Sequence, residues 1–136
     1  HPSLDGRFGL LGSSMGGLIS MYAVSEYPNV FGGAACLSTH WPGNSNDGHD
    51  NPVPSAFFNY IEKYFPAPGK TKIYFDHGTE TLDASYAPRQ LKVDALLRKK
   101  GYDASNWLTL TYKGAEHNEL AWSARLDIPL QFLLAK

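Results

Sequence analysis

The chain has 136 residues, of which 43% are hydrophobic, and this length is enough to bury the core of one domain. Its 12 basic and 13 acidic residues leave a formal net charge of −1, which gives no electrostatic reason to expect nucleic acid or a membrane surface as a partner. No apolar stretch approaches the roughly 18 residues of a membrane-spanning helix, and the single cysteine excludes an intrachain disulfide and leaves the cellular compartment open.

Short apolar runs alternate along the chain with longer segments of helix length. A short apolar run bounded by turn residues predicts a strand that a parallel sheet buries on both faces. Strands are predicted over residues 7–11, 33–38, 71–76 and 107–112. Helices are predicted between and after them, over residues 16–27, 56–65, 89–100 and 120–134.

Individual residues add detail to the predicted helices. Apolar residues cover most of the circumference of the segment 16–27, which predicts a helix buried on all sides. Ser55 is the predicted N-cap of the second helix, and Gly101 is predicted to end the third. Leu91 is among the residues that we expect on the inward face of the third helix. The last helix is expected to break at residues 127–129, where the sequence contains a proline.

The order of these elements is β-α-β-α-β-α-β-α. It predicts an α/β fold with a mostly parallel sheet of about four strands that helices flank on both faces. We treat residues 1–136 as a single domain of this kind. Ligands of such sheets bind outside the carboxyl ends of the strands. The functional site is therefore expected in the loops that begin at Gly12, Thr39, His77 and Lys113.

Ser14 lies at the junction between the first predicted strand and the first helix, in a G-x-S-x-G pattern. A serine on such a turn presents its hydroxyl at the end of the sheet, and Gly12 and Gly16 are expected to relieve the crowding of the turn. The helix that follows points its positive end at the site, so the Met15 N–H is predicted to stabilise an oxyanion. The pattern predicts Ser14 as a nucleophile and gives Ser13 no such role.

A serine nucleophile requires a base within hydrogen-bond reach and an acid that orients the base. His117, in the loop after the last strand, is the predicted base. Glu80 and Asp83, in the loop after the third strand, are the candidate acids, and either gives the chain order of the α/β-hydrolases. His40 and Trp41, at the end of the second strand, are predicted to line a substrate pocket.

The polar loop NSNDGHD, residues 44–50, offers Asp47, His49 and Asp50 as candidate metal ligands. It lacks the spacing of an EF-hand, and it has no second histidine at helical spacing. We therefore expect a solvated loop that shapes the mouth of the substrate site, and no metal centre.

Three segments together carry a family resemblance: GSSMGG, IYFDHGTETLDASY and GAEHNELAW. They resemble a group of esterases in the α/β-hydrolase superfamily that includes siderophore (enterochelin-type) esterases, feruloyl esterases and S-formylglutathione hydrolase-like proteins. The resemblance extends over about residues 9–134. It implies a serine esterase with Ser14 as nucleophile, His117 as base and no metal or cofactor. The TLD-x-x-Y pattern favours Asp83 as the acid, with Glu80 as the alternative.

The resemblance covers only the C-terminal half of such an enzyme. Its members have several strands before the nucleophile strand, and these strands supply the second donor of the oxyanion hole. Without them the strand over residues 7–11 would be an exposed apolar sheet edge, which a protein in water must cover. We therefore expect a truncated hydrolase that covers this edge by forming a homo-oligomer, or one that an N-terminal segment completes.

Two functions follow from these observations. The favoured one is hydrolysis of small-molecule esters with short-chain or aromatic acyl groups, through an acyl-enzyme intermediate. The alternative is a catalytically weak or inactive half-hydrolase that acts as a binding or assembly domain. The missing strands support the alternative, whereas a serine, an acid and a histidine at three separate strand ends support the enzyme.

Overall fold

The computed structural model describes residues 4–43 and 50–135. In this part of the chain the backbone forms one four-stranded sheet, and every pair of neighbouring strands is parallel. A helix connects each strand to the next, as a parallel pair requires. The predicted α/β fold is confirmed. The strands are β1 (Phe8–Ser13), β2 (Phe31–Leu37), β3 (Lys72–His77) and β4 (Trp107–Thr111), in the order β1-β2-β3-β4.

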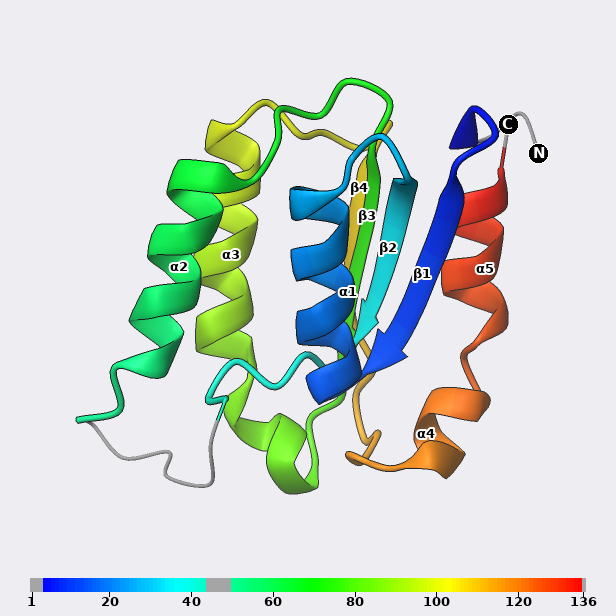
Figure 1. Ribbon diagram of the computed structural model, residues 1–136. Coiled ribbons are helices and arrows are strands. Elements are labelled where there is room, and N and C mark those ends of the chain that lie inside the picture. Colours follow the sequence, from blue (N-terminus) through cyan, green and yellow to red (C-terminus); the bar gives the residue numbers. More distant parts are fainter. Residues whose placement is uncertain (1–3, 44–49, 136) are drawn as a thin grey trace.

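Helices cover both faces of the sheet (Figure 1). On β2, Ala34 and Cys36 belong to the hydrophobic core on one face, whereas Ala35 and Leu37 pack with Leu133 on the other. This alternation follows from the two-residue period of a strand. One face carries α1 (Met15–Glu26), α2 (Val53–Tyr64) and α3 (Ala87–Lys99), and the other carries α4 (Glu119–Ser123) and α5 (Asp127–Leu134).

One detail of the second predicted helix and one of the third are wrong. α2 begins at Val53 with Pro52 at its N-cap, so Ser55 lies inside the first turn. Pro54 fits there because its fixed φ suits the first turn, where its missing N–H has no intrahelical partner in any case. Leu91 of α3 does not face inward but is 67% exposed. The last predicted helix is broken as expected, but at residues 124–126 and not at 127–129, because α4 ends at Ser123 and α5 begins at Asp127 with Pro129 in its first turn.

The edge of the sheet at β1 and the neighbouring helix α1 expose apolar side chains. Among the described residues β1 lies at the sheet edge and pairs only with β2, and Phe8 is 68% exposed. The neighbouring helix α1 is not buried on all sides as predicted, since Ile19 is 62% exposed and Tyr22 is also exposed. We call these residues, Phe8, Leu11, Ile19 and Tyr22, the β1–α1 side.

Within the described part of the chain, the helices are too short or too polar to cross a lipid bilayer.

Candidate active site

Ser14 lies between β1 and α1, on a sharp turn. Its φ of 58° and ψ of −117° place it outside the regions that residues other than glycine commonly adopt. The Ser14 N–H donates to the Leu37 carbonyl of β2 at 2.9 Å, and the Ser14 carbonyl accepts the His40 N–H at 3.2 Å. The backbone of β2 and of the residues after it therefore holds this strained turn at the carboxyl end of the sheet.

The glycines around Ser14 have different roles. A Cβ on Gly12 would lie 2.3 Å from the carbonyl oxygen of Gly16, which is closer than the two atoms can approach. A Cβ on Gly16 would meet no described atom within 4 Å, but one on Gly17 would lie 2.7 Å from Thr39 Oγ1. The turn therefore requires glycine at position 12, as expected. In the helix that follows, a side chain would be crowded at position 17 and not at position 16.

Three predicted residues come together in a series of hydrogen bonds. Ser14 Oγ lies 2.9 Å from His117 Nε2, and His117 Nδ1 lies 2.6 Å from Asp83 Oδ1. An ionised carboxylate only accepts, so the proton of the neutral imidazole is on Nδ1, and Nε2 accepts the Ser14 hydroxyl. A base in this position can take the serine proton as the oxygen attacks an electrophile.

Asp83 lies in a 3₁₀ helix, η2 (Thr81–Ser85), and is 1% exposed. Its Oδ2 accepts the Gly78 N–H and the Ser38 hydroxyl, each at 2.6 Å. Burial acts to raise the pKa of this carboxyl, but the hydrogen bonds from His117, Ser38 and Gly78 outweigh burial and lower the pKa from its ordinary value of 3.8. Asp83 is therefore ionised at neutral pH.

Hydrogen bonds join the loop after β3 to the loop after β4. Thr81 Oγ1 accepts the His117 N–H at 2.8 Å, and the Ala115 carbonyl accepts the N–H groups of Thr79 and Glu80 at 3.0 Å each. The Glu80 side chain is exposed and accepts the Thr79 hydroxyl at 3.3 Å. The geometry therefore favours Asp83 over Glu80 as the candidate acid.

The two residues predicted to line a substrate pocket lie in different places. The His40 ring lies beside the His117 ring, with 6.3 Å between centroids, and His40 Nδ1 is 2.5 Å from the Tyr86 hydroxyl. Trp41 is 0% exposed and donates from Nε1 to Gln90 at 3.1 Å. Trp41 thus belongs to the hydrophobic core, so the structure does not support a substrate contact for it.

Met15 is the first residue of α1. The N–H groups of the first helical turn have no acceptor within the helix, and they lie at the positive end of the helix dipole. The Met15 N–H directly follows Ser14 in the chain, as the predicted oxyanion donor must.

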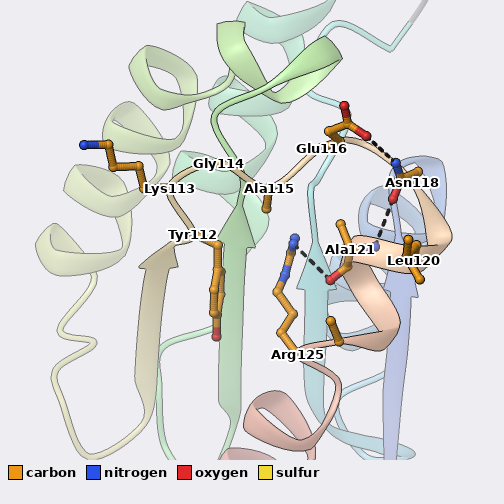
Figure 2. Close-up of a pocket in the computed structure, with 10 residues that line it drawn as sticks. Tyr112, Lys113, Gly114, Ala115, Glu116, Asn118, Leu120, Ala121 and Arg125 are labelled. Carbon is orange, nitrogen blue, oxygen red and sulfur yellow. Dashed lines mark hydrogen bonds between the residues drawn. The ribbon is translucent and has the colours of Figure 1, made fainter.

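A pocket of about 540 Å³ borders the loop that carries His117. Glu116 and Asn118 of this loop line it, together with Leu120, Arg125 and Tyr112 (Figure 2). Ser14 is not among its lining residues. The pocket therefore lies beside the loop that carries His117 and does not include the candidate nucleophile.

Residues 44–49 of the candidate metal loop, which include Asp47 and His49, lie outside the described residues. Among residues 4–43 and 50–135, no group of three or more histidine, cysteine, aspartate or glutamate side chains could hold a metal ion.

Sequence reasoning missed two polar residues near the site, Ser38 and Tyr86. Both are buried, Ser38 at the end of β2 and Tyr86 just before α3. Two signals in the sequence could have found them: Ser38 is the last residue of the predicted strand over residues 33–38, and Tyr86 is the tyrosine of the TLD-x-x-Y pattern.

Comparison with known proteins places this geometry in a family. A family model described as “Putative esterase” matches residues 2–130. Enterochelin esterase from Shigella flexneri has a similar structure, with a TM-score of 0.69 at 20% identity over 92% of this chain and 29% of that chain. Ferric enterobactin esterase from Salmonella typhimurium gives a TM-score of 0.67 at 19% identity, over 96% of this chain and 31% of that chain.

A relative from Bacillus subtilis (strain 168), “Uncharacterized protein YbbA”, is 24% identical in an alignment 135 positions long that covers 94% of this chain and 49% of that protein. The chain therefore spans about half the length of this relative and less than a third of the two solved structures. At this level of identity the solved structures show the shared fold alone. Because the family model matches nearly the whole chain, the chain belongs to the “Putative esterase” family.

Proposed function

We propose that the chain carries the catalytic residues of a serine carboxylesterase that hydrolyses short-chain or aromatic esters. The observation that carries this proposal is the series of hydrogen bonds from Ser14 through His117 to Asp83. The three residues follow three different strands, β1, β4 and β3, and a purely structural domain does not require them to meet. Membership of the esterase family supports an ester as the substrate.

In the proposed reaction Ser14 Oγ attacks the ester carbonyl carbon while His117 Nε2 takes the hydroxyl proton. Asp83 stabilises the imidazolium that forms, since it is ionised and bonded to Nδ1. The negative charge on the carbonyl oxygen is stabilised by the Met15 N–H at the start of α1. The alcohol then leaves with the proton from His117, and the acyl group remains on Ser14.

Water completes the proposed cycle. His117 takes a proton from the water molecule as it attacks the acyl-enzyme, and it returns this proton to Ser14 Oγ when the carboxylic acid leaves. These steps use only side chains and a backbone N–H of this chain, with no metal or cofactor.

His40 is the candidate substrate contact, because its ring lies beside that of His117. A structure of the enterobactin esterase FES from Shigella flexneri was solved in the presence of 2,3-di-hydroxy-N-benzoyl-glycine. This aromatic compound supports a test of aromatic acyl groups beside short aliphatic ones.

The adjacent serines offer a matched pair of variants for the test. Hydrolysis of p-nitrophenyl acetate and p-nitrophenyl benzoate is expected to fall by at least about 10³-fold in Ser14→Ala. Ser13→Ala, one residue away at the end of β1, is expected to stay close to the unmodified chain. A fluorophosphonate probe should label the unmodified chain and Ser13→Ala but not Ser14→Ala. Equal hydrolysis by the two variants would remove Ser14 from the mechanism.

One observation favours a second candidate, a weak or inactive half-hydrolase that acts in binding or assembly. The β1–α1 side is exposed, and within the described residues the Met15 N–H is the one oxyanion donor that we assign. Loss of a single such donor costs an enzyme about 10²–10³-fold in kcat. A second copy of the chain, or an N-terminal segment, would cover this side in either function. A folded sample that the fluorophosphonate does not label would favour the second candidate.

A further inference from the structure

Arg125 and Asp76 form a buried ion pair that is connected to the Asp83 carboxylate through Ser38. Arg125 donates from Nε and Nη2 to the two carboxylate oxygens of Asp76, at 3.1 and 2.8 Å. Asp76 also accepts the Tyr74 hydroxyl at 2.8 Å and the Ser38 N–H at 3.2 Å. Burial raises the pKa of the Tyr74 phenol, and the charge of Asp76 raises it further, so this hydroxyl remains a donor.

The guanidinium of Arg125 has little freedom to move. It lies between α4 and the strand ends, where it also donates to the Ala121 carbonyl at 3.4 Å (Figure 2). The ring of Tyr112 lies against it, with 4.8 Å between the guanidinium carbon and the ring centroid. Both Arg125 and Asp76 are buried. The ion pair therefore holds the Arg125 guanidinium in one position, from which its N–H groups donate to neighbouring acceptors.

Ser38 connects this ion pair to Asp83. Its Oγ accepts one N–H of Arg125 Nη2 at 3.1 Å and the Trp122 Nε1–H at 2.9 Å. Guanidinium and indole nitrogens only donate, so these two bonds occupy both lone pairs of the hydroxyl oxygen. The hydroxyl proton is left for Asp83 Oδ2, at 2.6 Å. The neighbours of Ser38 therefore leave its hydroxyl a single orientation, toward Asp83.

The backbone of Ser38 is strained. Its φ of 44° lies in the left-handed region, and the residue is 0% exposed. Glycine adopts this conformation without the steric cost that a Cβ brings. A glycine here would relieve the strain but would lack the hydroxyl that donates to Asp83. Backbone strain of this kind is most often found at functional sites.

We propose that Ser38 is a positioning residue of the candidate active site, whose hydroxyl holds the Asp83 carboxylate in the orientation that His117 requires. The inference rests on the proposed serine esterase function and adds one residue to it. In this proposal Ser38 acts through Asp83, which accepts the Ser38 hydroxyl with Oδ2 and the His117 Nδ1–H with Oδ1.

The Ser38 hydroxyl provides one of three side-chain or backbone hydrogen bonds that lower the pKa of Asp83 against the effect of burial. Its removal is therefore expected to raise that pKa. The titratable and charged groups that surround this carboxyl or the imidazole bonded to it are His117, Arg125 and Asp76, with Tyr86 and His40 beside the His117 ring.

The test compares Ser38→Ala and Ser38→Gly with Thr39→Val. Both Ser38 variants lack the hydroxyl, but glycine suits the left-handed backbone and is expected to fold if alanine does not. Thr39 provides the control, since its buried hydroxyl has no hydrogen-bond partner among the described residues. The measurements are kcat and KM for p-nitrophenyl acetate as a function of pH, and the pKa of Asp83 followed by carbon-13 NMR of its carboxyl group.

Both Ser38 variants are expected to lose about tenfold to a hundredfold in kcat with KM unchanged, as for a displaced catalytic group. The pKa of Asp83 is expected to move up, because a hydrogen bond that stabilises its ionised form is lost. A pKa of Asp83 that is the same in the Ser38 variants as in Thr39→Val would overturn the inference, and this measurement needs no substrate. Absence of hydrolysis by the unmodified chain would instead count against the proposed function.

Discussion

Gly12 is the residue of the Ser14 turn that has no room for a side chain. Gly12→Ala is expected to lower the free energy of unfolding by about 1–3 kcal/mol, because the added Cβ would overlap the Gly16 carbonyl oxygen. Gly16→Ala is the matched control on the other side of Ser14. It is expected to leave stability unchanged or to raise it by up to about 1 kcal/mol, since alanine favours a helix and its Cβ meets no described atom. Urea unfolding of both variants checks this, and equal losses would contradict it.

Single residues were predictable from the sequence where a motif fixes their surroundings. The G-x-S-x-G pattern placed Ser14 correctly on a strand-to-helix turn, because the backbone of such a turn is determined locally. The sequence left Asp83 and Glu80 open, since which carboxylate reaches His117 depends on how two loops pack. Trp41 was misplaced for a related reason: its neighbour His40 reaches the site, but an adjacent residue can point into the core.

Among the secondary-structure elements, the strands and the spacing of the helices were predictable, and the exposure of helix faces was not. Alternating apolar runs of different length identify a β-α repeat whatever packs against it. Exposure depends on which neighbours are present, so α1 was expected to be buried all round although Ile19 is exposed. Leu91 of α3 shows the same limit of periodicity, because it is apolar but lies outside the packed face.

The 3₁₀ helix η2 is joined to its neighbours through Asp83, which bonds residues that follow β2, β3 and β4. The pKa of Asp83 in the folded chain lies below its ordinary value of 3.8. The ionised carboxylate therefore adds stability at pH values above 3.8, and this contribution is lost as the pH falls through the folded-state pKa. Asp83→Asn is expected to lower the free energy of unfolding by about 1–3 kcal/mol at pH 7.

Urea unfolding from pH 7 down to pH 2 checks this expectation. The difference between Asp83→Asn and the unmodified chain should shrink as the pH falls from 3.8 through the lower folded-state pKa, because below that pKa the aspartate is protonated and neutral like asparagine. Glu80→Gln removes a carboxylate three residues away that is exposed, and it is expected to have little effect at any pH. A difference that stays constant across this range would show that the charge of Asp83 contributes nothing to stability.

The molecule as a whole has an exposed apolar sheet edge at β1, among the described residues. Next to the β4 edge of the sheet, the loops that carry the candidate acid and base are joined by hydrogen bonds. The opposite edge is the β1–α1 side. There the strand that leads to Ser14 presents unpaired backbone groups and exposed apolar side chains among the described residues. An edge of this kind favours pairing with another strand. The turn that carries the proposed nucleophile therefore lies next to the least protected part of the described fold.

We propose that the 136-residue chain, expressed by itself, self-associates through the β1–α1 side. Light scattering after size-exclusion chromatography is expected to give a mass above 15.0 kDa that increases with concentration. The double variant Phe8→Lys, Ile19→Lys is expected to shift the chain toward the monomer, because charged side chains on an edge oppose pairing. Leu91→Lys is the control, since it changes a side chain of similar exposure on α3. An unmodified chain that remains at 15.0 kDa at every concentration, or a Leu91→Lys effect equal to that of the double variant, would contradict this interface.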